Sequence, residues 1–506
     1  MIDLSKHNRA TIALNKWKAN RGVGTLCHVT GFGKTREGLL LAKQVLTKYP
    51  DDYVLITIPS VTVDKVWHNA IENADNDEYL EFTDIQKEHI EIVSVTSLLN
   101  DTPTRNYKLL IVDEIHKFTT PERYTIFDKL SYTSILGLTG TYPIGIKKAM
   151  LDKYCPIVDT IYEQEALTNG WISEFIEYNI ACELTDEDKI RYDKFTVLIS
   201  ETLNLFKGLS KHIIKQDGEP LFKDDYNVIQ SCKSGLKTKD VLGKPLYIPA
   251  KHIRQTIAIY REWTPTLDIT TEFGKERDDY WNPENIKVRV TNFTDFVRHR
   301  NDIIINNKVK LNKVLDIINA FPNKTICFNE STDFADDIAT ALNDNAHRQI
   351  ATVYHSNITS RPIWDDRLDD YFRYGKSSAK KGQVKLFGKD TLKSVAIQGL
   401  IDNTFKVLCT AKALDEGLDI PTIEQVITTA GTANPIQYEQ RKGRGLRLDI
   451  YNPNKVTKIF NLYFEDFINP RGEITKSRDK QKLIAKQRER SSNVVWITEL
   501  SEILTP

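Results

Sequence analysis

The strongest chemical signal in the sequence is a glycine-rich segment followed, further along the chain, by an acidic pair. Residues 30–35 are Thr-Gly-Phe-Gly-Lys-Thr, and residues 113–116 are Asp-Glu-Ile-His. Gly31 and Gly33 permit a tight turn whose backbone N–H groups can hold phosphate oxygens. A helix that begins after such a turn points its positive end at the same anion. The first segment therefore predicts a site for nucleotide phosphates.

The polar side chains of the two segments fit the hydrolysis of a nucleoside triphosphate. Lys34 is expected to reach the β- and γ-phosphates. Thr35 and Asp113 offer oxygen atoms to Mg²⁺, and Glu114 can orient or deprotonate the attacking water. Lys34 and Glu114 are thus candidate catalytic residues. The candidate ATP-binding residues of this loop are Thr30, Gly31, Gly33, Lys34 and Thr35.

Both segments have plainer interpretations when each is taken alone. A glycine-rich turn commonly precedes a helix, and an acidic pair is ordinary at the exposed end of a strand. The longer form of the phosphate loop also has a glycine where this chain has His28, so only the short form GxGKT is present. The apolar run before Asp113 and the order of the two segments favour an NTPase over the plainer alternatives.

The elements that must position these residues are predicted from hydrophobic patterning. Strands are expected at Val23–Thr30, Leu109–Val112 and Ile135–Leu138, alternating with helices. This alternation indicates a parallel sheet covered on both faces, which binds ligands where its strands end. Further strands are expected at Lys324–Phe328, Ile350–Tyr354, Phe405–Cys409 and Gln425–Thr428. The fold class is therefore α/β, with two parallel-sheet domains in tandem.

The domain organisation follows from changes in this pattern along the chain. A mixed, polar stretch separates the two α/β regions, and it is too long for a structureless loop. We expect a largely helical or mixed accessory insertion there. The predicted parts are an α/β domain at 1–160, a connecting segment at 161–189, the insertion at 190–305, a second α/β domain at 306–465, and a basic helical tail at 466–506.

Composition limits the possible partners and compartments. The 506 residues carry 69 Lys and Arg against 69 Asp and Glu, so any surface for nucleic acid must be local. The six cysteines are scattered and form no CxxC pair, which argues against zinc and disulfides and fits a reducing cytosol. No apolar leader or membrane span is predicted. We expect a cytoplasmic protein of a bacterial or phage-infected cell.

The order of short motifs along the chain resembles that of superfamily 2 helicases and translocases. Residues 440–447 match the pattern QRxGRxxR at all five fixed positions. The other matching segments are Thr30–Thr35 (motif I), Pro59-Ser60 (Ia), Thr96-Ser97 (Ib), Asp113–His116 (a DExH motif II), Leu138–Thr141 (III), Ile326–Phe328 (IV) and Val407–Thr410 with Glu416–Pro421 (V).

This resemblance implies two RecA-like domains, of the P-loop NTPase fold, with ATP and Mg²⁺ between them. Arg444 and Arg447 would be arginine fingers, and their guanidinium groups would complete the site when the cleft closes. Asp419 and Gln440 would also contact the nucleotide. The resemblance further implies that His116, Thr139 and Thr141 couple the nucleotide state to domain motion.

Two sets of residues are predicted to bind nucleic acid. The resemblance places short polar side chains on the phosphate backbone, where they would grip without reading bases. These are Ser60, Thr96, Ser97, His355, Ser356 and Thr410. The second set lies in the lysine-rich stretch 373–393, where cations are mixed with aromatic residues and fit phosphate contact with base stacking. Its candidates are Lys380, Lys381 and Lys385, and an exposed, solvated loop is the alternative.

Departures from the family pattern narrow the expected function. The glutamine that reads adenine in many members is missing, and Asn8 or Arg9 is the candidate replacement. The short stretch between Asp419 and Gln440 leaves little room for the strand-separating hairpin of some relatives. The segment 165–180 resembles phage branch-migration helicases and restriction-enzyme motors, which act on DNA.

We therefore predict an ATP-dependent DNA helicase or translocase, acting as a monomer on duplex, forked or branched DNA in replication, recombination or repair. Three alternatives stay open at this point. An RNA helicase could be built from the same motifs. The chain could be the motor of a restriction or nuclease system, with the nuclease on a partner. A non-enzymatic nucleotide switch is the last alternative, although it would have no need of Glu114, Arg444 and Arg447 together.

Overall fold

The computed structural model of the chain contains two compact units. Unit 1 consists of Met1–Cys182, Lys308–Tyr463 and Asp479–Pro506, and unit 2 consists of Glu183–Asn307 and Phe464–Arg478. The structure describes residues 4–60, 63–214, 218–239, 245–263, 282–365, 370–373, 380, 383–411, 420, 422–431, 434–449, 451–488, 491 and 493–504.

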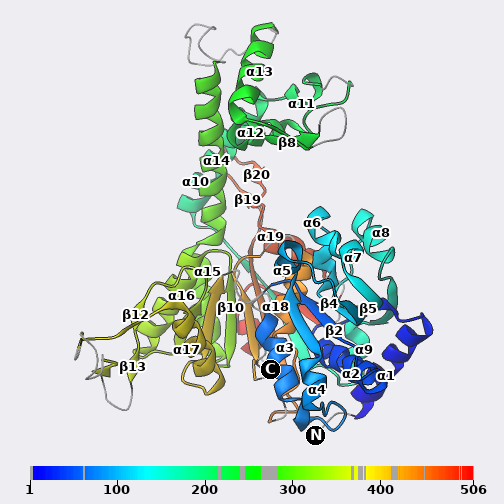
Figure 1. Cartoon of the computed structure of the whole chain (residues 1–506). Helices are drawn as coiled ribbons and strands as arrows, with labels where there is room; N and C mark the ends of the chain where they lie inside the picture. The colour runs from blue at the N-terminus through cyan, green and yellow to red at the C-terminus, as the bar shows by residue number, and fades with distance from the viewer. Residues whose placement is uncertain are drawn as a thin grey trace. The chain divides into compact units, whose positions relative to one another are not determined.

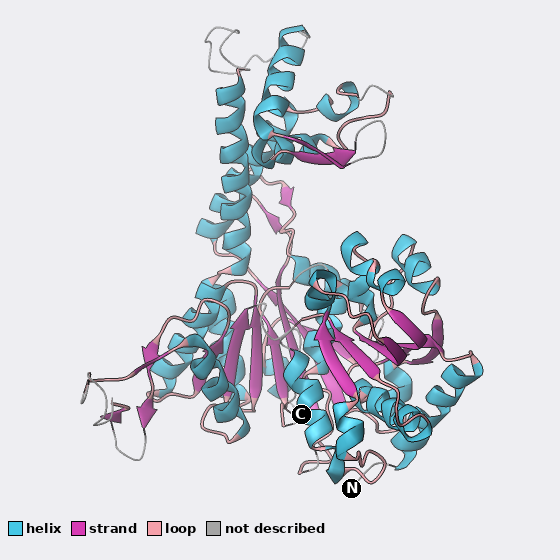
Figure 2. Ribbon diagram, viewed as in Figure 1, coloured by secondary structure: helices cyan, strands magenta, loops and turns pink. Residues whose placement is uncertain are grey.

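Unit 1 has two lobes, each built on one sheet (Figures 1 and 2). We call residues 4–173 the first lobe and the rest of unit 1 the second lobe. The six strands of the first lobe have the order β3-β2-β4-β5-β1-β6, and all their pairings are parallel. The strands are β1 (Val23–His28), β2 (Val54–Ile58), β3 (Ile90–Ser94), β4 (Asn106–Asp113), β5 (Ser131–Thr139) and β6 (Ile157–Ile161).

Helices connect the strands of the first lobe and cover its sheet, as Figure 2 shows. They are α1 (Leu4–Ala19), α2 (Lys34–Lys48), α3 (Asp64–Glu72), α4 (Asp84–Glu88), α5 (Val95–Asn100), α6 (Pro121–Tyr124), α7 (Ile126–Lys129), α8 (Ile146–Asp152) and α9 (Glu163–Thr168). Short 3₁₀ turns lie at Ala74–Asn76 and Ile115–Phe118. With a sheet covered in this way, all five residues of β2 are buried, as expected for a parallel strand.

The register of the first sheet brings three separate segments to one edge. Asp113 pairs with Leu138, and Cys27 pairs with Thr139, at the carboxyl ends of β4, β5 and β1. Parallel strands end at the same edge, so the loops that follow them meet there. The glycine-rich loop, the acidic pair and the segment after β5 are consequently neighbours.

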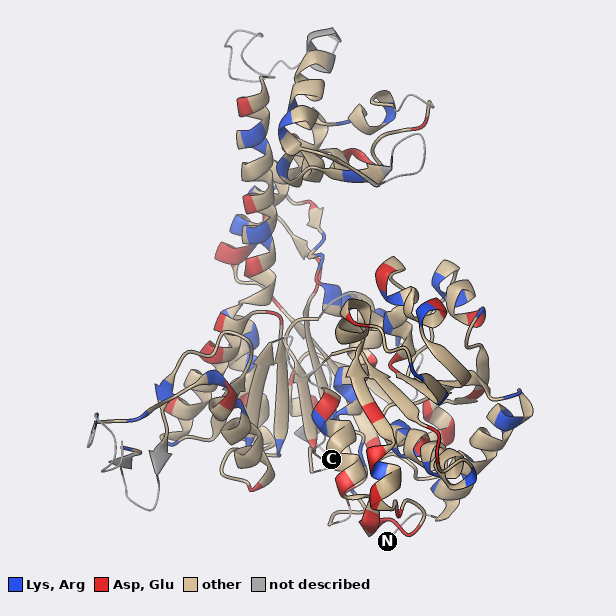
Figure 3. Ribbon diagram, in the orientation of Figure 1, with Lys and Arg blue, Asp and Glu red and all other residues tan. Residues whose placement is uncertain are grey.

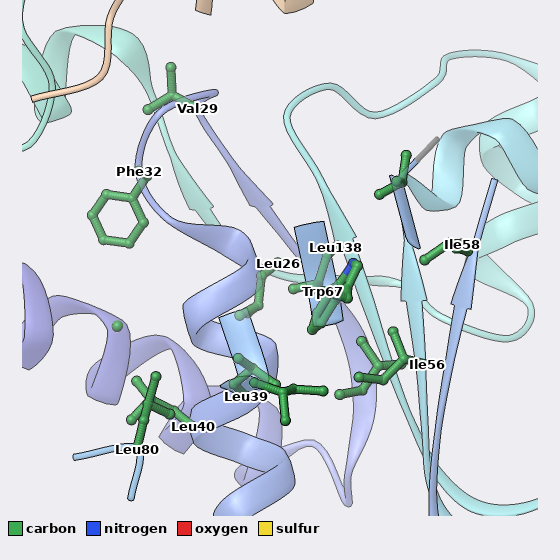
Figure 4. Packing of buried hydrophobic residues seen from close by; sticks show 14 of the residues in the cluster. Leu26, Val29, Phe32, Leu39, Leu40, Ile56, Ile58, Trp67, Leu80 and Leu138 are labelled. Carbon is green, nitrogen blue, oxygen red and sulfur yellow. The ribbon is translucent and has the colours of Figure 1, made fainter. Parts of the chain in front are cut away.

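One of the two apolar cores of the first lobe lies between α2, α3 and the sheet. Figure 4 shows Trp67 of α3 beside Leu138 of β5, with Leu26 and Leu39 close by. Burial of each such side chain contributes roughly 1.5–3 kcal/mol. Gly38 of α2 allows the close approach of Trp67, because a Cβ at position 38 would lie 2.7 Å from the Trp67 ring. This packing fixes the helix that begins at the glycine-rich loop.

The second lobe holds a seven-stranded sheet of order β11-β16-β10-β17-β18-β7-β21. Its strands are β7 (Glu174–Cys182), β10 (Thr325–Asn329), β11 (Ala351–Tyr354), β16 (Val407–Ala411), β17 (Gln425–Thr428), β18 (Val456–Phe464) and β21 (Val494–Ile497). Its helices are α15 (Lys308–Ala320), α16 (Thr332–Ala346), α17 (Lys389–Ile401), α18 (Pro435–Gly443), α19 (Lys480–Gln487) and α20 (Ser501–Leu504). Two small two-stranded antiparallel sheets pair β12 (Arg361–Pro362) with β15 (Leu386–Phe387) and β13 (Trp364–Asp365) with β14 (Asp370–Tyr371).

Unit 2 is mainly helical and has its own apolar core. Its long helices are α10 (Asp186–Leu205), α13 (Ala250–Trp263) and α14 (Pro283–Ile305), with α11 (Leu209–His212) and α12 (Asp225–Ser234) beside them. The hairpin β8 (Leu236–Lys239) and β9 (Pro245–Ile248) and the hairpin β19 (Phe467–Ile468) and β20 (Ile474–Thr475) complete it. Phe206, Val228 and Phe293 lie in the core. Figure 3 shows cations and anions mixed along α14, as on an ordinary solvated helix.

The fold predicted from sequence is confirmed: two parallel sheets in tandem with a mainly helical insertion. Two segments differ in detail from the prediction. The connecting segment 161–189 contributes β7 to the second sheet, and the tail 466–506 contains the strand β21 as well as helix. Residues 494–497 are Val-Val-Trp-Ile, a β-branched and aromatic run that suits a strand. Among the described residues, no helix is long and apolar enough to cross a membrane.

Candidate nucleotide site

The loop between β1 and α2 has the backbone of a phosphate-binding turn. Gly31 and Gly33 have φ of 95° and 109°, in the left-handed region that favours glycine. Gly33 caps the N-terminus of α2, so free N–H groups of the helix begin at Lys34 and Thr35. The loop therefore presents the positive end of α2 to an anion, as its sequence predicts.

The amino group of Lys34 is held at the mouth of this loop. Its Nζ donates to the backbone carbonyl of His28 at 3.2 Å. A Cβ at Gly140, in the segment after β5, would lie 3.4 Å from the same Nζ and 2.8 Å from Thr30 Oγ1. Lys34, Thr30 and the segment after β5 thus share one small space, and a Cβ at position 140 would crowd the hydroxyl of Thr30.

The acidic pair follows β4, and its two carboxylates have different surroundings. Asp113 is buried; its Oδ2 accepts from Trp67 Nε1 at 2.9 Å, and its Oδ1 accepts from the backbone N–H of Glu114 at 2.9 Å. Burial and then the charge of Glu114 raise the pKa of Asp113. Burial also acts to raise the pKa of Glu114, but the hydrogen bond from His116 and the charge of Lys34 outweigh it and lower that pKa. Glu114 is consequently the more acidic of the two carboxyl groups.

Glu114 adopts a backbone conformation that is rare for a residue with a side chain. Its φ is 47° and its ψ is 51°. Such strain of order 1–3 kcal/mol persists only where the surroundings enforce it, and it concentrates at functional sites. Here it turns the chain sharply after Asp113 and lets two successive carboxylates serve one site.

A hydrogen-bond chain connects the acidic pair to the segment after β5. Thr139 Oγ1 donates to the carbonyl of Thr141 at 2.7 Å, so its proton is already used. His116 Nδ1 lies 2.9 Å from Thr139 Oγ1 and 3.3 Å from Glu114 Oε2, and must therefore be the donor to both. His116, Thr139 and Thr141, the predicted coupling residues, are thus joined to Glu114.

The donor set suits Mg²⁺ bound together with phosphate. Among the described residues, no group of three or more His, Cys, Asp or Glu could hold a metal by itself. Mg²⁺ in phosphoryl-transfer sites needs only one or two protein oxygens, because phosphates and water supply the others. Asp113 is a buried carboxylate beside a second acid, and it gains stability from a cation. Thr35 and Asp113 would hold the ion, which when bound neutralises charge on the phosphates.

The second lobe brings its arginine-rich segment against the glycine-rich loop. A Cβ at Gly443, the last residue of α18, would lie 2.1 Å from Thr30 Cγ2. A Cβ at Gly31 would lie 3.5 Å from the carbonyl oxygen of Leu446. The backbone N–H and Oγ of Ser173 donate to the carbonyls of Leu446 and Arg447 at 2.9 and 2.8 Å. The segment 443–447 is therefore packed directly on the phosphate loop.

Two known protein families match this chain, one over the segments of the first lobe that form the site and one over those of the second lobe. Residues 5–144 match the family described as type III restriction enzyme, res subunit, and residues 388–449 match the helicase conserved C-terminal domain. The first match includes the phosphate loop and the acidic pair, and the second includes residues 440–447. These two matches support a superfamily 2 helicase or translocase family for this chain.

Three known proteins are similar to this chain. “Putative ATP-dependent RNA helicase MJ1505” of Methanocaldococcus jannaschii is 23% identical over 473 residues, which are 84% of this chain and 54% of that protein. “Putative ATP-dependent RNA helicase QP509L” of African swine fever virus (isolate Pig/Kenya/KEN-50/1950) is 30% identical over 137 residues, 24% of this chain and 26% of the viral protein. This chain thus spans about half of the first relative and about a quarter of the second.

The crystal structure of the Pyrococcus furiosus Hef helicase domain is 13% identical to this chain. The matched region covers 89% of this chain and 95% of that domain, with a TM-score of 0.41. The description of the first matched family agrees with the resemblance to restriction-enzyme motors. The resemblance to phage branch-migration helicases stays a prediction.

The remaining residues predicted to contact the nucleotide differ in their surroundings. Gln440 lies on α18, and Arg444 follows it, and both are nearly buried. Asp419 falls outside the described residues. Arg9, a candidate for reading adenine, is engaged elsewhere: it donates to Asp159, to Glu165 and to the carbonyl of Thr160. That half of the hypothesis is wrong for this structure, because the guanidinium is already satisfied, whereas Asn8 is exposed.

The side chains predicted to hold the nucleic-acid backbone are only partly accessible. Thr96, Ser97 and Ser356 are exposed and Ser60 is half-buried. Thr410 is 0% exposed, and its hydroxyl donates to the carbonyl of Tyr354 at 2.8 Å.

His355 is also buried, at 1% exposed. Its Nε2 lies 3.2 Å from Asp336, and its Nδ1 accepts from the backbone N–H of Asn357. A direct phosphate contact is therefore not available to Thr410 or His355 here, since burial and existing partners occupy both side chains.

The lysine-rich stretch lies partly within the described residues. Lys380 and Lys385 are exposed, and Lys385 Nζ lies 4.8 Å from the centre of the Phe387 ring. Lys381 falls outside the described residues. Cation and aromatic ring are thus neighbours at this edge of the second lobe, which keeps the predicted contact with phosphates and bases open to test.

Sequence analysis missed two residues that support the site. Trp67 donates to Asp113 from α3, and no short motif links two residues so far apart in the chain. His28 was noted only as a departure from a glycine, but its ring lies at the centre of a buried charge cluster behind the loop. The accompanying acids Glu37 and Asp159 carried no signal of their own in the sequence.

Proposed function

We propose that this chain hydrolyses ATP between its two lobes and uses the cycle to move on nucleic acid. The packing of Gly443 against Thr30 is the single observation that supports this most directly. It places the segment of Arg444 and Arg447 beside the loop that would hold the phosphates. A site shared between two lobes changes when the γ-phosphate leaves, which is the usual route from hydrolysis to motion.

The proposed reaction assigns one task to each group. A water molecule attacks the γ-phosphorus while the bond to the β–γ bridging oxygen breaks, giving ADP and phosphate. Glu114 accepts the proton of the water, and Lys34 with Arg444 and Arg447 stabilises charge on the transferring phosphoryl group. His116 senses the state of Glu114 and passes it to Thr139 through the hydrogen bond described above.

For the substrate, we propose duplex, forked or branched DNA, with RNA as the second candidate. The DNA proposal rests on the short stretch between Asp419 and Gln440 and on the likeness of segment 165–180 to DNA motors. The RNA candidate is supported by the names of the two relatives, both of which are called RNA helicases. The cell compartment, the monomeric state and a role in replication, recombination or repair belong to the same proposal.

An ATPase assay with separate nucleic acids tests both the motor function and the choice of DNA or RNA as substrate. Turnover is measured without nucleic acid and with single-stranded DNA, duplex DNA, forked DNA, a four-way junction and RNA, and Lys34→Ala serves as the negative control. We expect the largest stimulation from forked or branched DNA. Stimulation by RNA alone would replace the DNA proposal with the RNA one, and an ATPase unaffected by every nucleic acid would contradict the motor.

A further inference from the structure

His28 lies directly before the phosphate loop, and its ring is enclosed between two carboxylates. The side chain is 0% exposed. Its Nδ1 lies 2.9 Å from both oxygens of Glu37 on α2, and its Nε2 lies 2.9 Å from Asp159 Oδ2 on β6. Phe32 of the loop packs edge-on against the ring, with centroids 5.3 Å apart. The ring therefore joins α2, β6 and the loop.

The hydrogen bonds of this ring require a definite protonation state. A neutral imidazole has one N–H donor and one lone pair, whereas an imidazolium has two donors. With a carboxylate on each nitrogen, the neutral ring would turn a lone pair toward one of the anions. Both contacts of His28 are satisfied when both ring nitrogens carry a proton.

A charged His28 ring also balances the positive and negative charges of the wider cluster. Asp159 also accepts from Arg9 Nη1 at 2.6 Å and from Lys16 Nζ at 2.5 Å, both on α1, and Arg9 Nε donates to Glu165 at 2.9 Å. With the ring charged, the cations His28, Arg9 and Lys16 face the anions Glu37, Asp159 and Glu165. An uncompensated buried charge is costly, so this balance favours the imidazolium. Burial by itself lowers the pKa of His28, but Glu37 and Asp159 outweigh it and raise that pKa.

The backbone of His28 touches the catalytic lysine. Its carbonyl oxygen accepts from Lys34 Nζ at 3.2 Å, and the ring of the same residue is anchored to Glu37, which lies one turn into α2. The ring thus fixes both the carbonyl that holds the lysine and the start of the helix that faces the phosphates. Glycine, the usual residue here, has no side chain that could form this anchor.

We propose that His28 is a positioning residue of the ATP site, held as an imidazolium whose two ion pairs fix the phosphate loop and hold Lys34 ready for ATP. The proposal rests on the ATPase function proposed above and adds a pH-dependent element to it. When the ring loses its proton, one carboxylate faces a lone pair and the loop is no longer fixed. ATP affinity therefore stays constant at low pH and falls as the pH rises through the raised pKa of His28.

The protonation state is tested on the whole wild-type chain by NMR. The chain has 10 histidines, and ¹⁵N labelling of histidine reports the protonation of each ring. The His28 signals are identified by their loss in His28→Gln and by their shift in Asp159→Asn. At pH 7.5 we expect both ring nitrogens of His28 to carry protons. A neutral His28 ring at that pH would overturn the proposal, whatever the ATPase activity.

The positioning role is tested by binding of a fluorescent ATP analogue with Mg²⁺ between pH 6 and 9. We expect the Kd of wild type to rise roughly tenfold across the titration of His28, the scale of one lost hydrogen bond to a charged group. His28→Gln should bind more weakly at pH 6 and lose this pH step. His68→Gln, a change at an exposed histidine of α3, should behave as wild type.

The outcomes distinguish a failure of the positioning role of His28 from a failure of the proposed ATPase function. A wild-type Kd that does not change with pH, or a pH step that persists in His28→Gln, would refute the positioning role. A wild-type chain that binds no ATP at any pH would instead contradict the proposed function, while the NMR result would still decide the charge of His28.

Discussion

Glu163, the first residue of α9 in the first lobe, forms an ion pair with Lys442 on the helix that precedes Arg444. Lys442 is 1% exposed and also contacts Glu439 at 2.7 Å. Glu163 accepts from Arg488 as well, at 3.2 Å. One acid of the first lobe thus holds two cations of the second lobe, next to the proposed arginine fingers.

Glu163→Gln should weaken the contact between the lobes. The substitution keeps the shape of the side chain but leaves the buried Lys442 with less compensating charge, a loss that can reach 3–5 kcal/mol for a fully buried pair and is smaller here because Glu163 is partly exposed. We expect lower nucleic-acid-stimulated ATPase turnover, by roughly tenfold, and a lower melting temperature. Glu122→Gln, at an exposed acid of α6, is the matched control. Unchanged turnover and stability would show that the ion pair has no role.

Gly443→Ala should block the approach of the second lobe to the phosphate loop. The new methyl group would lie 2.1 Å from Thr30 Cγ2, so one of the two segments must move. We expect turnover to fall by about 100-fold, the loss typical of a misplaced charge-stabilising group, with ATP binding affected less. Gly388→Ala is the control, because nothing lies within 4 Å of a Cβ there. Wild-type turnover in Gly443→Ala would contradict the contact.

Glu114→Gln and Lys34→Ala should separate chemistry from binding. Glu114→Gln removes the base, and we expect turnover to fall by roughly 10²–10⁴-fold while ATP still binds. Lys34→Ala removes the cation that faces the phosphates, so both binding and turnover should fall. Turnover from single-cycle kinetics and affinity from equilibrium binding give the two quantities. If either variant keeps wild-type turnover, the assignment of the site is wrong.

Trp67→Phe should disturb Asp113. It removes the N–H that donates to Asp113 Oδ2 and leaves a buried carboxylate short of a partner, at a cost of about 1–3 kcal/mol. We expect a lower free energy of unfolding and a higher Mg²⁺ requirement for hydrolysis. Chemical denaturation and a magnesium titration of the ATPase measure these effects. A variant with wild-type magnesium dependence would mean that the indole does not support Asp113.

Lys380→Glu, Lys381→Glu and Lys385→Glu, combined in one chain, should weaken nucleic-acid binding. Each phosphate contact that is lost reduces the slope of log K against log salt by about 0.7–0.9. The ATPase measured without nucleic acid should stay near wild type, because none of these lysines is assigned to the nucleotide site. Binding isotherms at several salt concentrations give the slope. An unchanged slope would refute the predicted contact.

Local patterns were sufficient to predict the two sheets and the segments that follow their strands. Runs such as Val54–Ile58 indicate buried strands, and Gly31 and Gly33 permit the tight turn that the structure contains. The match at residues 440–447 depends only on residue types and spacing. Each of these features depends on a short stretch of chain, so it can be recognised from the sequence alone.

Contacts between residues far apart along the chain could not be predicted from the sequence. Nothing in local spacing indicates that Trp67 donates to Asp113, or that Arg9 is engaged by Asp159 and is therefore unable to read a base. Thr410 and His355 matched family positions, yet burial decides that their polar atoms serve the protein itself. Burial and partners depend on how all the elements pack.

The sequence by itself determined the kind of protein, because the phosphate loop, the acidic pair and the arginine-rich segment are each short and chemically specific. Only the tertiary structure decided how they cooperate. It placed Gly443 against Thr30, Glu163 against Lys442, and the ring of His28 between two acids. Charge and close packing act over a few ångströms in space, and these residues become neighbours only after the sheets have formed.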